Sequence, residues 1–246
     1  MDMTPGSMSD RRQIGRRTAI RNQRRKWTRA ASSWDHHGMA GLGAVIDAVL
    51  AETPSDPVKL AIDVGAGTGA IAVPLASQVE QVIALDVSAA MLDELRMRAD
   101  REGVGNIEAR VTPIEDFEAE PASVDLVVSN YALHHLLDRD KRAFVERAAT
   151  WLRPGGKLVI GDMMFGRGVT ANDRAIIGSK VRIMLRRGPG GWWRVAKNGW
   201  RFATRTSERP IPIDSWLALV ADAGLVDGTG SRVVAEAAVV TATRPV

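Results

Sequence analysis

The stretch K-L-A-I-D-V-G-A-G-T-G-A-I, residues 59–71, decides the fold of this chain. Leu60, Ile62 and Val64 alternate with small or acidic residues, which is the pattern of a short buried strand. The glycines that follow permit positive φ angles and let a ligand approach the backbone. A helix that we expect to begin near residue 70 adds N–H groups without intrahelical partners. Strand, glycine turn and helix together predict a nucleotide-type binding site.

The glycine spacing separates two kinds of nucleotide site. Gly65, Gly67 and Gly69 are spaced G-x-G-x-G, whereas dinucleotide-binding proteins use G-x-G-x-x-G. With Asp63 two residues ahead, the segment resembles motif I of the class I S-adenosyl-L-methionine (SAM) dependent methyltransferases. A nicotinamide or flavin site and a purely structural turn are the alternatives. The resemblance implies cofactor contacts at Asp63, Gly65, Ala66, Gly67 and Gly69.

A second anchor follows the next predicted strand, residues 81–85. Asp86 ends that strand and lies 21 positions after Gly65. A carboxylate there can accept both hydroxyls of a ribose lying across the glycine turn. A helix-capping or surface role for Asp86 is the alternative. The resemblance also implies a cofactor contact at the following residue, Val87.

Residues 112–117, T-P-I-E-D-F, are similar to the adenine-binding motif of the same family. The acidic residue of that motif would fall on Pro113, so this side-chain contact is lost. The resemblance implies adenine contacts from the backbone N–H and side chain of Ile114. Either Glu115 or Asp116 would reach the exocyclic amine, or else both carboxylates face solvent.

Two further segments complete the resemblance. They are S-N-Y-A-L-H-H-L (residues 129–136) and L-R-P-G-G-K-L (residues 152–158). With them the chain resembles the type 11 methyltransferases, which include quinone-biosynthesis and natural-product enzymes, over roughly residues 59–163. The resemblance implies a cofactor contact at Asn130. No prolines follow Asn130, unlike the (D/N/S)-P-P-(Y/F) motif of enzymes that methylate amino groups, and this favours an oxygen acceptor.

A histidine pair gives the family's candidate for proton transfer. In several small-molecule members two histidines after strand four and an aspartate after strand five contact the acceptor hydroxyl, and the matching positions are His134, His135 and Asp162. A neutral imidazole, with an ordinary pKa of about 6.5, can take the hydroxyl proton. A packing or capping role for one histidine is the alternative. We expect no catalytic metal and no covalent nucleophile, because the sulfonium of SAM is already an activated donor.

Composition excludes several classes of protein. The chain has 246 residues, 45% of them hydrophobic, which fits one α/β domain with an insertion. Cysteine is absent, which excludes disulfides and cysteine chemistry. We find neither a secretory h-region nor an apolar run of the roughly 18 residues that a membrane span needs. We therefore expect a cytoplasmic protein.

Basic residues gather in two segments of the chain. Residues 11–29 carry nine Arg or Lys, and residues 174–209 carry ten with one acid, although the net charge is only +4. Four interpretations stay open. The segments line a pocket for an apolar acceptor, lie on an anionic membrane as a peripheral contact, bind RNA through arginine and tryptophan, or form a solvated basic face.

The repeated strand–helix rhythm predicts an α/β fold: a doubly wound, mostly parallel, seven-stranded Rossmann-like methyltransferase sheet with a helical lid. We expect the following plan: a disordered tail (1–10), a methyltransferase domain (11–246), and within it an N-terminal helical cap (11–52), a SAM-binding core (59–165), a basic Trp-rich lid (166–210), and a closing helix and hairpin (211–246). The resemblance implies SAM as cofactor, S-adenosyl-L-homocysteine (SAH) as its product, and methylation of a small, largely apolar metabolite at oxygen rather than at carbon or nitrogen. An RNA methyltransferase and a non-catalytic SAM-binding regulatory module are the alternatives.

Overall fold

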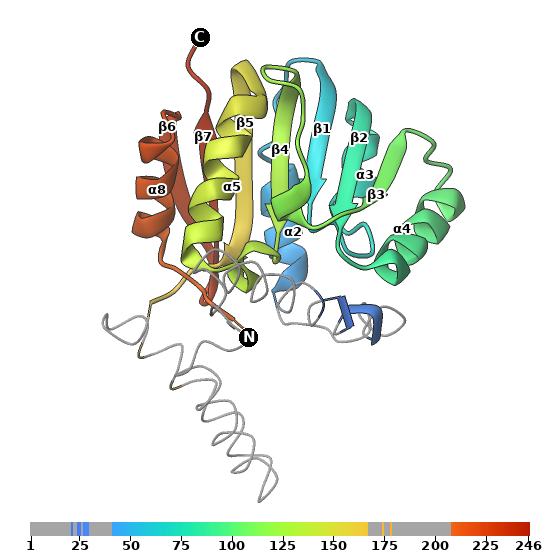
Figure 1. The fold of residues 1–246 in the computed structure, drawn as a ribbon, viewed down its shortest axis with the longest axis horizontal. Helices are drawn as coiled ribbons and strands as arrows, with labels where there is room; N and C mark the ends of the chain where they lie inside the picture. The colour runs from blue at the N-terminus through green and yellow to red at the C-terminus, as the bar shows by residue number, and fades with distance from the viewer. Residues whose placement is uncertain are drawn as a thin grey trace, which may run out of the picture.

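A computed structural model of the protein describes residues 21, 24, 25, 27–29, 41–166, 174, 178 and 208–246. In this part of the chain the strands form a seven-stranded sheet of order β3-β2-β1-β4-β5-β7-β6 (Figure 1). The strands are β1 (Val58–Val64), β2 (Val79–Asp86), β3 (Ile107–Val111), β4 (Val124–Asn130), β5 (Leu152–Met163), β6 (Val226–Val234) and β7 (Ala237–Thr243). The helices are α2 (Leu42–Leu50), α3 (Ala72–Ala76), α4 (Ala89–Arg101), α5 (Asp138–Trp151) and α8 (Ile213–Asp222), with 3-10 turns η2 (Ile114–Asp116) and η3 (Leu133–His135).

Strand pairing confirms the predicted doubly wound sheet. β1 pairs in parallel with β2 and β4, β2 with β3, and β4 with β5, whereas β7 runs antiparallel to both β5 and β6. The chain moves outward from β1 to β3 and then returns to place β4 on the other side of β1. Open α/β sheets bind ligands outside the carboxyl ends of the strands at such a switch point. The fold therefore places a site where β1, β2 and β4 end.

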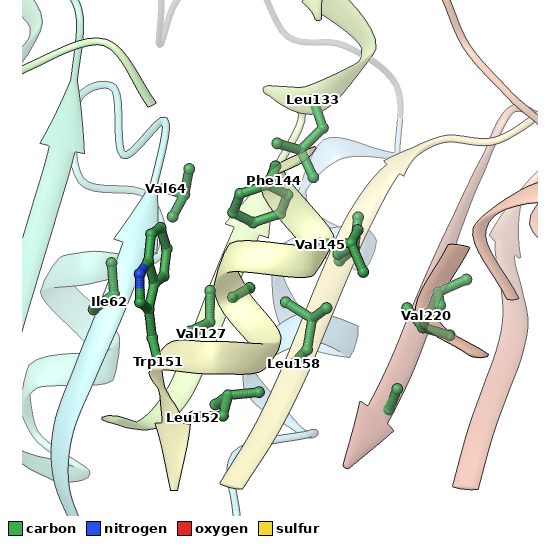
Figure 2. Close-up of a cluster of buried hydrophobic side chains, with 14 of the residues drawn as sticks. Ile62, Val64, Val127, Leu133, Phe144, Val145, Trp151, Leu152, Leu158 and Val220 are labelled. Carbon is green, nitrogen blue, oxygen red and sulfur yellow. The ribbon is translucent and has the colours of Figure 1, made fainter. Parts of the chain in front are cut away.

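Apolar layers cover both faces of the sheet. α5 and α8 pack on one face, and Figure 2 shows Trp151 of α5 beside Ile62 of β1, with Phe144 and Val145 of the same helix in the same buried layer. α2, α3 and α4 pack on the other face, which the neighbouring residue Ala61 joins. Successive residues of β1 thus enter different cores, as expected for a parallel strand that is buried on both sides.

Close packing of α2 on β5 depends on one glycine. A Cβ built on Gly161 would lie 2.4 Å from Cγ2 of Val49 and 3.1 Å from Cγ1 of Val45. Both valines are buried and come from the inward face of α2. Gly161 therefore lets this helix lie directly against the end of β5, beside the switch point.

Three local features of the elements carry little signal in the sequence. β5 contains an irregularity, because β4 pairs with Leu152 and then with Lys157. β6 begins at Val226, and its first seven residues are exposed, so this run with two glycines shows no alternation of apolar and polar residues. Ser88 occupies the N-cap position of α4, but its side chain makes no capping hydrogen bond.

Most of the two basic segments falls outside the described residues, and with it the predicted lid. None of the helices in the described part of the chain combines the length and the apolar character needed to cross a membrane.

A matched pair of glycine substitutions tests the packing of α2. We expect Gly161→Ala to lower the free energy of unfolding by about 1–3 kcal/mol, because the added methyl group displaces α2. In contrast, a Cβ on Gly43, within α2 itself, meets no heavy atom within 4 Å. Gly43→Ala should raise stability by about 0.5 kcal/mol through helix propensity. Urea unfolding of both variants measures the difference, and equal effects would contradict the packing assigned to Gly161.

Candidate functional site

The glycine turn joins β1 to α3 and is tied to the end of β2. The backbone N–H groups of Gly65 and Ala66 donate to the carbonyl of Leu85 over 2.8 and 2.9 Å. Gly65 has a φ of 75°, and a Cβ there would lie 2.3 Å from the Cβ of Ala132. Gly67 has a φ of 54°, and a Cβ there would meet no heavy atom of the described residues within 4 Å. The turn thus packs closely against the chain after β4 and leaves open space at Gly67.

Asp86 holds the other side of this turn. One carboxylate oxygen accepts the N–H of Gly67 over 3.1 Å, and the other accepts the N–H of Ser88 over 2.8 Å. Burial raises the pKa of Asp86, and these backbone hydrogen bonds partly offset the effect. Both oxygens are therefore fixed in place at the end of β2.

Asp63, near the end of β1, is a second buried carboxyl group. It is 1% exposed, and burial raises its pKa to about 7, with a smaller contribution from the negative charge of Asp86. Its Oδ2 atom is buried and has no hydrogen-bond partner among the described residues. A buried carboxyl oxygen without a donor costs free energy, so a ligand that supplies an N–H or a positive charge is favoured here.

One pocket collects residues from the ends of β1, β2 and β4 and from the loop after β3. Nine of the ten residues predicted to bind the cofactor line it, as does one of the three predicted catalytic residues. These are Asp63, Gly65, Ala66, Gly67, Asp86, Val87, Ile114, Glu115 and Asn130, together with His135. The Oδ1 atom of Asn130 is buried without a partner in the described part of the chain. Gly69 does not line the pocket, and a Cβ there would lie 2.9 Å from Leu95 and Val73, which gives this glycine a packing role.

His134 and Asp162 form a buried pair behind the pocket. Nδ1 of His134 lies 2.5 Å from Oδ1 of Asp162, and the His134 backbone N–H donates to Oδ2 over 2.8 Å. The N–H of Met163 also donates to Oδ1, over 2.7 Å. Neither His134 nor Asp162 lines the pocket. These hydrogen bonds to Asp162 fix the orientation of the His134 ring and of η3.

His135 is the histidine that faces the pocket. Its ring lies between Trp27, with ring centroids 5.1 Å apart, and His134, with centroids 4.0 Å apart. Trp27 also lines the pocket. The two adjacent histidines therefore differ in position: His135 lines the pocket, and His134 lies behind it.

Sequence reasoning did not single out Tyr131. This residue lines the pocket with a φ of 50°, which is uncommon outside glycine, and its N–H donates to the carbonyl of Gly161 over 2.8 Å. Burial raises the pKa of its hydroxyl, and the negative charges of Glu236 and Asp162 act in the same direction. Strained backbone of this kind often occurs at functional sites. A positive φ at tyrosine leaves no signal in the sequence.

Lys141 on α5 was also missed, although its position gave a signal. It falls on the apolar stripe of α5 with Phe144 and Val145, and it is fully buried. Its Nζ donates to the carbonyls of Leu136 (3.0 Å) and Arg209 (2.7 Å). The Arg209 N–H donates in turn to the carbonyl of His134 over 2.6 Å. Lys141 thus holds the backbone at Arg209 against η3, the turn that contains both histidines.

The described residues of the N-terminal segment contact the same region (Figure 1). Arg24 donates through Nε to the carbonyl of Val87 over 3.1 Å. The hydroxyl oxygens of Thr28 and Ser88 lie 3.2 Å apart, which accounts for the side chain of Ser88 that does not cap α4. The segment therefore lies next to the end of β2, where Asp86 is held.

Both a family model and individual relatives that match this chain are methyltransferases. Residues 61–156 match the family model described as a methyltransferase domain. The chain is 29% identical over 158 residues to the ubiquinone biosynthesis O-methyltransferase of Xylella fastidiosa, covering 62% of each protein. It is 32% identical over 123 residues to phosphoethanolamine N-methyltransferase 1 of Triticum aestivum, covering 48% of this chain and 24% of the relative. The match thus spans less than two thirds of the length of either relative.

Solved structures share the fold. The DhpI–SAH complex aligns over 92% of this chain and 97% of its own, with a TM-score of 0.66 and 18% identity. Phosphoethanolamine N-methyltransferase 1 of Haemonchus contortus, in complex with phosphoethanolamine and S-adenosylhomocysteine, aligns over 62% of this chain and 34% of its own, with a TM-score of 0.55 and 21% identity.

The placement within the type 11 group stays a prediction. Residues 61–156 match a methyltransferase domain, and the sheet order is that of the solved methyltransferase structures. The chain is therefore similar to class I SAM-dependent methyltransferases in both sequence and fold.

Proposed function

We propose that the protein transfers a methyl group from SAM to a small, largely apolar metabolite, at an oxygen atom. One observation carries the proposal: a single pocket is lined by the glycine turn and Asp86 on one side and by Tyr131 and His135 on the other. A donor and an acceptor would therefore meet within one cavity, as a transfer between two bound molecules requires.

The pocket residues fit SAM. Asp86, fixed by two backbone hydrogen bonds, would hold the ribose hydroxyls, and Ile114 would contact the adenine. The buried oxygens of Asp63 and Asn130 that have no partner among the described residues call for hydrogen-bond donors, and the amino-acid part of SAM carries an ammonium group. When bound, SAM supplies a methyl group activated by its positive sulfur.

His135 is our candidate for the group that takes the acceptor proton. It lines the pocket, whereas His134 is held behind it by Asp162. We assign His134 and Asp162 the role of positioning η3 and therefore the ring of His135. Apolar walls around this position, including Trp27 and Leu136, exclude water that would compete with the acceptor.

The relatives support the choice of acceptor only in part. The Xylella fastidiosa relative is an O-methyltransferase of ubiquinone biosynthesis, which supports an oxygen atom on an apolar molecule. The wheat and Haemonchus contortus proteins are phosphoethanolamine N-methyltransferases, so a polar amine is the second candidate. The basic segments 11–29 and 174–209 lie mostly outside the described residues. Their contact with an acceptor, an anionic membrane or RNA stays a prediction, as does a cytoplasmic location.

A labelled-methyl assay tests the function. Purified protein and SAM with a labelled methyl group are incubated with phenols, quinols, extracted lipids, phosphoethanolamine and RNA. We expect label in a phenol, quinol or lipid product. Label in phosphoethanolamine or RNA alone would contradict the acceptor class. Binding of SAH without transfer to any acceptor would favour the regulatory module.

Asp86→Asn should weaken SAH binding at least about tenfold, because a charged hydrogen-bond acceptor is lost at the ribose. Asp93→Asn is the matched control, since Asp93 forms an exposed ion pair with Arg96 on α4. Isothermal titration calorimetry measures both. Unchanged affinity in Asp86→Asn would count against the ribose contact.

His135→Asn should lower kcat about 100-fold or more while leaving the dissociation constant of SAH within about threefold, because general base catalysis is lost but the cofactor contacts remain. We also expect the wild-type enzyme to lose activity at low pH, where an imidazole is protonated, and the variant to lack this loss. Steady-state kinetics between about pH 5.5 and about pH 9, a range that spans the ordinary pKa of an imidazole, measure both effects. An unaltered kcat would remove His135 from the mechanism.

Asp63→Asn should stabilise the protein in the absence of ligand, and more so as the pH rises. Asp63 keeps its proton up to a pKa of about 7 in the folded state but loses it from its ordinary value of 3.8 when unfolded. The folded state therefore binds the extra proton in this window, and wild-type stability falls as the pH rises through it. The advantage of the variant should grow by up to about 1.4 kcal/mol per pH unit and level off above pH 7. Urea unfolding at several pH values checks this, and a constant advantage would contradict it.

A further inference from the structure

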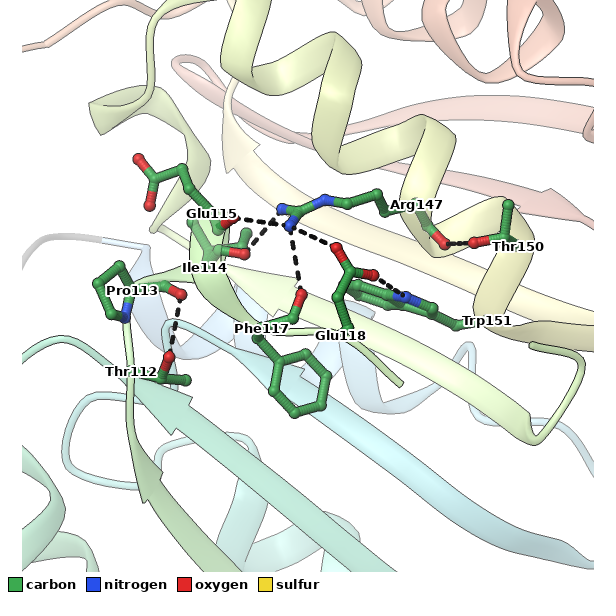
Figure 3. A network of polar contacts seen from close by, with 9 residues as sticks. All are labelled: Thr112, Pro113, Ile114, Glu115, Phe117, Glu118, Arg147, Thr150 and Trp151. Carbon is green, nitrogen blue, oxygen red and sulfur yellow. Dashed lines mark hydrogen bonds and ion pairs between the residues drawn. The ribbon is translucent and has the colours of Figure 1, made fainter. Parts of the chain in front are cut away.

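Arg147 lies on α5 and holds the loop that follows β3 by its backbone (Figure 3). Its Nη1 atom donates to the carbonyls of Glu115 over 2.9 Å and Phe117 over 3.2 Å. Its Nη2 atom donates to the carbonyl of Ile114 over 2.7 Å. One guanidinium group thus binds three carbonyls within four consecutive residues. Two of these carbonyls belong to η2, and the third belongs to Phe117, which follows it.

The guanidinium is itself held from two sides. Glu118 accepts a hydrogen bond from Nη1 of Arg147 over 3.3 Å and one from Nε1 of Trp151 over 3.1 Å. The guanidinium lies 5.6 Å from the centroid of the Trp151 ring, and the Phe117 ring meets the same indole edge-on at 5.4 Å. Trp151 is buried in the core, so the position of Arg147 is coupled to the most rigid part of the fold.

This arrangement determines which side of the loop faces the pocket. The three carbonyls point toward α5, whereas Ile114 and Glu115 line the pocket. Pro113 has no N–H, so Ile114 carries the first backbone donor of η2. The N–H of Ile114 has no hydrogen-bond partner among the described residues. A backbone donor without a partner among the described residues therefore belongs to a residue that lines the pocket, where the proposed function places the adenine.

We propose that Arg147 is a positioning residue that makes the pocket selective for adenine. The inference rests on the proposed function, since it concerns the purine of SAM. A donor N–H suits adenine, whose ring nitrogen N1 is an acceptor, and opposes hypoxanthine, whose N1 carries a hydrogen. Because Arg147 fixes the carbonyls of the loop, it also fixes the direction of this N–H. Arg147 itself need not touch the ligand.

Calorimetry with two ligands tests the inference on the full chain. SAH and S-inosylhomocysteine, its hypoxanthine counterpart, are titrated into wild-type protein and Arg147→Met. We expect SAH to bind about tenfold more weakly to the variant, with a clearly smaller change for S-inosylhomocysteine, because only the adenine gains from the oriented N–H. The preference for adenine should therefore fall. A merely structural role would weaken both ligands equally.

Two matched variants separate the carbonyl contacts from the charge. Arg142→Met removes an arginine of the same helix that makes an exposed ion pair with Asp222, and it should leave both affinities unchanged. Glu118→Gln removes the ion pair of Arg147 but leaves its carbonyl contacts, and it should change SAH affinity less than about twofold.

If Arg147→Met does not fold, Arg147→Lys serves instead, since a lysine keeps the charge but lacks the planar fork that reaches three carbonyls.

The outcomes are distinct. Wild-type affinity for SAH in the folded Arg147 variant, an equal loss for both ligands, or a loss in Glu118→Gln as large as in the Arg147 variant would each overturn the inference alone. A wild-type protein that does not bind SAH would instead overturn the proposed function, and the inference with it.

Discussion

The site depends on two carboxyl groups at the ends of neighbouring parallel strands. Asp63 lies near the end of β1 and Asp86 at the end of β2, and burial makes each of them harder to ionise. The negative charge of Asp86 adds to this effect for Asp63. The glycine turn lies beside this pair and donates the N–H of Gly67 to Asp86, but one oxygen of Asp63 has no donor in the part of the chain that the structure describes. The fold therefore retains an unfavourable electrostatic arrangement at the switch point, which a ligand carrying donors and positive charge relieves.

α5 connects this arrangement to both ends of the pocket. Its apolar face packs on the sheet through Phe144 and Trp151. From the same helix Lys141 binds the backbone near η3, where His135 faces the cavity, and Arg147 binds the loop after β3. The walls proposed to contact the acceptor and the adenine are thus fixed by one rigid helix, although they are far apart in sequence.

The parts of the fold that are set by local pattern could be predicted from the sequence. The strand predicted at residues 81–85 lies within β2, and the doubly wound sheet follows from the strand–helix rhythm. The beginning of β6 could not be predicted, because its exposed residues bury no apolar face that would leave a period. For the site, spacing was enough to place Asp86 at the end of β2, beside the glycine turn.

Tertiary geometry decided the rest of the site. The sequence could not distinguish His134 from His135 as the candidate for proton transfer. The ring that lines the cavity is determined by the direction of a 3-10 turn, and Asp162 fixes that direction. The carbonyl contacts of Arg147 depend on the distance between α5 and a loop about thirty residues earlier in the chain. Such contacts cannot be read from the spacing of residues in the sequence, because every residue has a backbone carbonyl and the acceptor therefore leaves no mark on the residue type.

The backbone of Tyr131 limits how this position can change during evolution. A positive φ is readily adopted by glycine and tolerated by asparagine or aspartate, but it is costly for valine, isoleucine or threonine. Diversification of this wall is thus confined to a narrow set of side chains, unless the segment between β4 and η3 relaxes at the same time. Relatives that bind differently shaped acceptors would then be expected to differ here in backbone course as well as in residue type.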